Sequence, residues 1–78
     1  MRSTESWIGL ILELAPNEFA LQGPDDPIEG HLDSLAIFEL TARIEEAAHV
    51  PDLLTDLTIP DLATVGTLAR ALSTRDAS

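Results

Sequence analysis

Ser34 is the residue of this sequence that is best placed to carry chemistry. It follows Asp33 directly, and the pair stands between a long loop and a run of apolar residues at helical spacing. A helix N-terminus presents unpaired N–H groups and a partial positive charge, so it stabilises a phosphate attached there. A serine hydroxyl at such a turn can therefore hold a phosphodiester. The same Asp-Ser pair is also typical of an ordinary helix cap, and composition alone leaves both interpretations open.

The two histidines do not add a catalytic or metal site. His31 lies close in sequence to Asp26 and Asp33, but two carboxylates and one imidazole in a loop are a poor ligand set, so we expect exposed loop residues. His49 is expected near the end of a helix, where the helix dipole favours it. A Ser-His-Asp triad is not expected, because Ser34 and His31 are too close in the chain and nothing supplies an oxyanion pocket.

The composition excludes further classes of chemistry. No Cys is present, which excludes a disulfide, a thiolate nucleophile and a Cys-ligated metal. We expect no catalytic residue, no metal and no enzyme activity.

Fourteen Asp and Glu residues against four basic residues give a net charge of -10 over 78 residues. Such a chain repels nucleic acid and anionic membranes, so we expect neither as a partner.

Length and hydropathy narrow the class of protein. The apolar fraction of 45% is ordinary for a folded domain. No apolar run approaches the ~18 residues of a membrane span, and the N-terminus does not resemble a signal peptide. The sequence therefore predicts one small cytoplasmic domain over residues 1–78, a monomer that proteins with basic patches recognise.

Apolar periodicity predicts the helices that position Ser34. A first helix is predicted over residues 4–15, capped by Ser3 or Thr4 and ended by Pro16. Residues 16–32 form a long connection that is rich in proline and glycine. Four apolar residues are expected to pin this loop across the core: Phe19, Leu21, Ile28 and Leu32.

The C-terminal half of the chain is predicted to complete a bundle. Residues 51–63 leave room only for one or two short helical turns, whose leucines close the end of the core. A last helix is predicted to begin after a cap at Thr64 or Asp61 and to bury a stripe of four residues, with a frayed polar tail over 73–78. That stripe is Val65, Leu68, Ala69 and Leu72. The predicted fold is all-α: a small antiparallel bundle of three main helices plus one short helix, with a long loop after the first helix.

The second helix, predicted over residues 34–48 with Asp33 as its cap and Pro51 beyond its end, has two apolar faces. Plotted at about 100° per residue from Leu35, a core stripe falls between about 120° and 220°. Its members are Ile37, Leu40, Ile44, Ala47 and Ala48. The opposite side carries Leu35, Phe38 and Ala42, with Glu39, Glu45 and Glu46 among them. We predict that this outward face is a docking strip for basic partners. The alternative is that Phe38 packs into the core between neighbouring helices.

Three motifs together resemble a known family. Asp33-Ser34-Leu35, followed by Phe38-Glu39-Leu40 and Glu45-Glu46, resembles the Asp-Ser-Leu signature of acyl carrier proteins. Thr64-Val65-Gly66-Thr67-Leu68 is similar to the Thr-Val-x-x-Leu that opens the last helix of that family. Val50-Pro51-Asp52 resembles the Ile/Val-Pro-Asp that follows its second helix. In order and spacing, the resemblance covers nearly the whole chain, from Trp7 to Leu72.

The resemblance implies a function for Ser34. A phosphopantetheinyl transferase, using coenzyme A and a divalent metal, would attach 4'-phosphopantetheine to this hydroxyl. The thiol of the arm would carry an acyl or aminoacyl-derived group as a thioester for acyl-loading and acyl-accepting enzymes, such as an acyltransferase, a ketosynthase or an adenylating enzyme. Asp33 matches the acidic residue that helps to present the serine. The residues expected to contact partners are Asp33, Leu35, Phe38, Glu39, Ala42, Glu45 and Glu46.

Three departures from the family pattern favour a specialised carrier. His31 stands where the family usually has Gly, Ala36 stands where housekeeping fatty-acid carriers tend to be acidic, and Arg43 interrupts the acidic strip. They indicate a carrier of polyketide, antibiotic or related natural-product assembly. The start at Met1 and the end soon after the last helix favour a free-standing protein. The alternative is an unmodified acidic adaptor that binds a basic protein, with Ser34 as a phosphorylation site or a simple cap.

Overall fold

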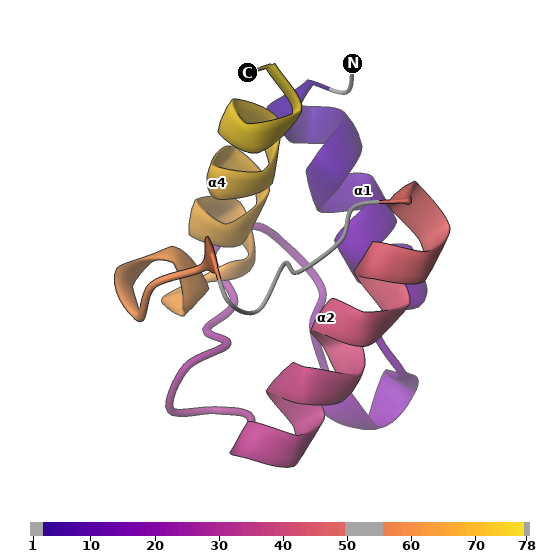
Figure 1. The fold of residues 1–78 in the computed structure, drawn as a ribbon. Coiled ribbons are helices and arrows are strands. Elements are labelled where there is room, and N and C mark those ends of the chain that lie inside the picture. The colour runs from indigo at the N-terminus through magenta and orange to yellow at the C-terminus, as the bar shows by residue number, and fades with distance from the viewer. Residues whose placement is uncertain (1–2, 50–55, 78) are drawn as a thin grey trace.

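The helices of the chain form a small all-α bundle. The computed structural model describes residues 3–49 and 56–77, with side chains described as far as Arg75. The helical elements follow along the chain in the order α1 (Thr4–Leu14), the 3-10 turn η1 (Asn17–Phe19), α2 (Ser34–Ala48), the 3-10 turn η2 (Pro60–Leu62) and α4 (Val65–Ala77). In Figure 1, α1 runs down the view while α2 and α4 run up, and α1 packs against both. The predicted class is confirmed.

Each α-helix begins at a side-chain cap that the sequence predicts. The Ser3 hydroxyl accepts a hydrogen bond from the Ser6 N–H at 3.2 Å. At α4, Thr64 and Thr67 cap each other: the Thr67 N–H donates to Thr64 Oγ1 at 3.2 Å, and the Thr64 N–H donates to Thr67 Oγ1 at 2.9 Å. This is the reciprocal arrangement of a capping box, with Thr in the place of Glu. Asp61, the other candidate, instead accepts from the N–H of Thr58.

The core lies where the three helices and the long loop meet. It includes the predicted stripe of α4 and draws Phe19 and Ile28 from the loop. Its buried apolar members are Trp7, Ile11, Phe19, Ile28, Leu40, Ile44, Val65, Leu68, Ala69 and Leu72. Leu21 and Leu32 pack against this cluster as partly buried residues. The prediction that the loop is pinned across the core is therefore confirmed.

Backbone hydrogen bonds fasten the same loop to the start of α4. The Ile28 N–H donates to the Ala63 carbonyl at 3.0 Å, and the Gly66 N–H donates to the Pro24 carbonyl at 2.8 Å. A Cβ on Gly66 would lie 3.0 Å from the Pro24 oxygen, so glycine permits this close approach. The loop is held from both sides, by apolar anchors and by main-chain bonds.

One sequence-based expectation about the core stripe of α2 is wrong. Ala47 was expected in the core stripe of α2, but it is exposed, and Thr41 is buried instead, with 2% of its surface exposed. The Thr41 hydroxyl donates to the carbonyls of Ile37 and Phe38 at 3.0 and 2.9 Å, which removes the cost of burying it. Helix α4 continues as far as Ala77, into the segment that was expected to fray, and Arg75 within it forms an ion pair with Asp56.

The structure also shows where α2 ends and how part of the connection after it packs. Helix α2 ends at Ala48, where His49 adopts the left-handed conformation with φ 57° and donates its N–H to the Glu45 carbonyl. The Val50-Pro51-Asp52 motif lies outside the described residues. In the described part of the connection that follows, Leu57 and Leu62 pack partly buried against the core. No helix in the described ranges is long and apolar enough to cross a membrane.

Candidate functional site at the start of α2

Ser34 is the first residue of α2 and is exposed to solvent. The loop reaches it through a tight turn, in which the Ile28 carbonyl accepts from the N–H groups of His31 and Leu32 at 3.2 and 2.8 Å. Gly30, with φ 87°, supplies the positive φ that this turn requires. Leu32 is half-buried, so the chain is anchored two residues before the serine. The turn and the anchored Leu32 therefore fix the position at which the chain enters α2 at Ser34.

Asp33 caps α2 and leaves the serine hydroxyl unengaged. Its Oδ1 accepts from the Ala36 N–H at 2.7 Å. The Ser34 hydroxyl makes no hydrogen bond to another described residue. The N–H groups of the first helical turn have no acceptor inside the helix, so those of Ser34 and Leu35 point out of its positive end. An anionic group esterified to Ser34 would be stabilised here.

His31 and Asp26 hold the loop. His31 Nε2 lies 3.0 Å from the Phe19 carbonyl, in hydrogen-bonding distance. The backbone N–H groups of Gln22 and Gly23 donate to the Asp26 carboxylate and hold the pKa of Asp26 below its ordinary value, and the charge of His31 lowers it further. Within residues 3–49 and 56–77, no group of three or more His, Asp or Glu side chains could hold a metal ion.

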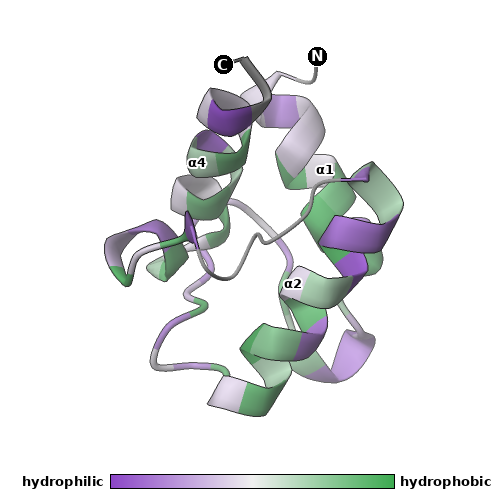
Figure 2. Cartoon of the chain, in the orientation of Figure 1, coloured by the Kyte–Doolittle hydropathy of each residue, from purple (hydrophilic) through white to green (hydrophobic). Residues whose placement is uncertain are grey.

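The outward face of α2 is exposed as predicted. Leu35 is 74% exposed and Phe38 is 58% exposed, and Ala42 is exposed beside them. Phe38 therefore does not belong to the core. Figure 2 shows the first turns of α2 as an apolar stretch at the end of the molecule.

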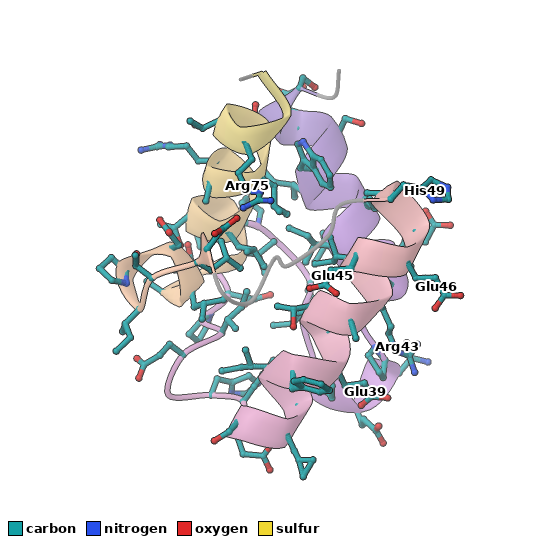
Figure 3. All side chains as sticks on the ribbon, viewed as in Figure 1. Glu39, Arg43, Glu45, Glu46, His49 and Arg75 are labelled. Carbon is teal, nitrogen blue, oxygen red and sulfur yellow. The ribbon has the colours of Figure 1, made fainter. Side chains whose placement is uncertain are left out.

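The acidic residues do not all share that face. Glu39 and Glu46 are exposed, whereas Glu45 is partly buried. Figure 3 shows Glu45 on the other side of α2 from Glu39, Arg43 and Glu46. The acidic residues of the expected partner set therefore divide between two sides of α2, with Glu39 and Glu46 on one side and Glu45 on the other.

Arg43 has two roles on this face that the sequence did not reveal. Its Nη2 forms an ion pair with Glu39 Oε1 at 3.0 Å. Its Nη1 lies 3.5 Å from the carbonyl of Leu14, the last residue of α1. The spacing of four residues could have indicated the ion pair. The contact with α1 joins residues 29 positions apart, so no local pattern could have indicated it.

A surface hollow of about 400 Å³ lies away from this site, between α4 and the segment around η2. None of its lining residues belongs to α2. They are Asp56, Leu57, Pro60, Asp61, Thr67, Arg70, Ala71, Thr74 and Arg75. The structure therefore does not join the hollow to Ser34.

The chain matches no family model, no curated protein and no solved structure.

Proposed function

We propose that this chain is an acyl carrier protein whose Ser34 hydroxyl is esterified with 4'-phosphopantetheine taken from coenzyme A. The observation that carries the proposal is the placement of Ser34, which is exposed at the first turn of α2 and bound by no other described side chain. A buried hydroxyl could not enter the active site of a modifying enzyme. This one stands at a helix end that the Asp33 cap and the half-buried Leu32 hold in place.

The surrounding residues fit the proposed group. A phosphodiester on Ser34 would lie beside the free N–H groups of Ser34 and Leu35, at the positive end of α2. The Asp33 carboxylate accepts a hydrogen bond from the Ala36 N–H, so its negative charge is partly offset by the positive end of the helix that it caps. When bound, the arm supplies a terminal thiol that holds an acyl group as a thioester. The chain has no Cys of its own to serve this purpose.

The partners proposed are the transferase and the enzymes that load and unload the acyl group. Leu35 and Phe38 are exposed within one turn of Ser34, so an enzyme that accepts the serine can also bury these two side chains. We assign the carrier to polyketide or related natural-product assembly because His31, Ala36 and Arg43 depart from the pattern of the family that the sequence resembles.

The test is intact mass after incubation with coenzyme A, Mg²⁺ and a broad-specificity phosphopantetheinyl transferase. We expect the wild-type chain to gain one phosphopantetheine and the Ser34→Ala variant to gain none. Ser6→Ala, which removes another exposed serine, is the matched control and should be modified like the wild type. A wild-type chain that gains no mass, or a Ser34→Ala chain that does, would exclude the proposal and favour the unmodified acidic adaptor.

A further inference from the structure

A side chain ties the turn before Ser34 to a part of the chain twelve residues earlier. The Nε2 of His31 lies 3.0 Å from the carbonyl oxygen of Phe19. A carbonyl oxygen can only accept, so Nε2 carries the proton and donates the hydrogen bond. We call this hydrogen bond the His31 clasp. It joins the turn to the end of η1, and η1 and the first turn of α2 both lie toward the lower end of the view in Figure 1.

The η1 end of the clasp is fixed in place. Phe19 is the last residue of η1, and its side chain is buried in the core. The next residue, Ala20, adopts the left-handed conformation with φ 57°, which ends the helical turn. The last carbonyls of a helical turn have no donor inside it. His31 therefore supplies a donor that the backbone of η1 lacks, and it binds at a point that the core holds.

The other end of the clasp lies beside the most flexible residue of the turn. Gly30, directly before His31, has φ 87° and no side chain to restrict it. The backbone bonds that fasten the loop to η2 and the start of α4 involve earlier residues, namely Pro24, Asp26, Ile28 and Glu29. Beyond them the chain is held by the bonds of the turn to the Ile28 carbonyl and by the packing of Leu32. The clasp therefore acts on the stretch that leads directly to Ser34.

We propose that His31 is a positioning residue for the modification of Ser34, and that its clasp holds the turn in the arrangement that the phosphopantetheinyl transferase accepts. The inference rests on the proposed carrier function and names a control on the same site. His31 takes no part in the chemistry. When the clasp opens, the turn can pivot at Gly30, and only the clasped fraction of the molecules presents the serine correctly. The apparent affinity of the enzyme falls in proportion to that fraction.

Three uncharged substitutions at His31 separate the hydrogen bond from the bulk of the side chain. His31→Gln keeps an N–H donor at about the reach of Nε2, His31→Asn holds its donor one methylene short of it, and His31→Leu has no donor. Gln22→Leu is the matched control. Gln22 is an exposed residue of the same loop, and its side chain makes no hydrogen bond to another described residue.

The first measurement is the steady-state kinetics of modification by a broad-specificity phosphopantetheinyl transferase with coenzyme A and Mg²⁺. His31→Leu and His31→Asn should raise KM for the carrier about two- to fivefold, as for the loss of one partly exposed hydrogen bond, and should leave kcat within about twofold. His31→Gln should return KM to near the wild-type value. Gln22→Leu should leave KM unchanged.

The second measurement is amide hydrogen exchange of the unmodified protein, which reports on the clasp without any enzyme. The Leu32 N–H, bonded to the Ile28 carbonyl in the turn, should exchange about two- to fivefold faster in His31→Leu and His31→Asn than in the wild type or His31→Gln. The Ile28 N–H, bonded to the Ala63 carbonyl, should keep its protection in every variant. A general loss of stability would expose both amides, so the pair distinguishes it from a loosened turn.

The outcomes separate this inference from the proposed function. If the wild-type chain is modified but His31→Leu and His31→Asn behave like Gln22→Leu, His31 is an ordinary loop residue, and the inference is wrong while the carrier function stands. The inference is also wrong if His31→Gln raises KM as much as His31→Leu, if kcat falls while KM stays constant, or if the exchange of the Leu32 N–H is unchanged. Should His31→Leu fold poorly, the comparison of His31→Gln with His31→Asn still decides. If the wild-type chain gains no phosphopantetheine, the carrier function fails and the inference falls with it, whatever the amide exchange shows.

Discussion

The exposure of Phe38 leads to a sharp prediction about stability. Phe38 and Ile44 lie on the same helix, six residues apart, but on different faces: Phe38 is 58% exposed and Ile44 is fully buried. Phe38→Ala and Ile44→Ala each remove a large apolar side chain from α2. The free energy of unfolding should respond very differently, because only Ile44 is surrounded by core atoms.

The expected magnitudes follow from these exposures. Fully burying a Phe contributes about 1.5–3 kcal/mol, and less than half of Phe38 is removed from water, so Phe38→Ala should lose about 1 kcal/mol of contact energy. The better helix propensity of Ala returns up to about 0.5 kcal/mol. The net cost is therefore roughly 0–1 kcal/mol. Ile44→Ala leaves a cavity between α2 and its neighbours and should cost about 2–5 kcal/mol.

Urea unfolding monitored by tryptophan fluorescence provides the assay. Trp7 is the single Trp of the chain and is buried in α1, so its emission should report loss of the core. In thermal unfolding followed by the same signal, at about 4–8 °C per kcal/mol for a domain of this size, Phe38→Ala should lower Tm by less than about 8 °C and Ile44→Ala by more. If both variants lose the same stability, Phe38 makes core contacts and its assignment to the outward face is wrong.

Four further predictions concern the site, the charge and the backbone. Ser34→Ala should alter the free energy of unfolding by less than about 1 kcal/mol in urea titration, whereas Asp33→Ala should cost about 0.5–2 kcal/mol because it removes the cap of α2. Raising salt from low ionic strength to ~0.5 M should raise Tm in calorimetry, since a net charge of -10 repels itself; a flat profile would contradict this. The lowered pKa of Asp26 means that its stabilising contribution is present above its unfolded pKa and is lost as pH falls through its folded pKa, so Asp26→Asn should flatten the acid limb of the stability profile. Gly9→Ala, with no atom within 4 Å of the added Cβ, should stabilise the chain by up to about 1 kcal/mol, and Gly66→Ala should gain less because its Cβ meets Pro24.

Local features of the sequence indicated where the helices begin and limited the cap of each helix to one or two candidate residues. Ser3, Asp33 and Thr64 each accept the hydrogen bond that their position predicts. Caps and helical periodicity involve residues three or four apart, so they can be read without knowing the fold. The same local signals placed Ser34 at the first turn of α2 and Phe38 on its outward face.

The tertiary structure decided the features that join distant parts of the chain. Arg43 meets the end of α1 across 29 residues, and the loop before Ser34 is fastened by its backbone to the start of α4. The buried edge of α2 includes Thr41 and leaves out Ala47, a choice that depends on the angle at which the neighbouring elements approach. The helical wheel gives the direction of each side chain from its own axis, but burial depends on where the other axes lie. Only the packed fold supplies those positions, so the sequence could locate the serine and could not show that Arg43 also meets the end of α1.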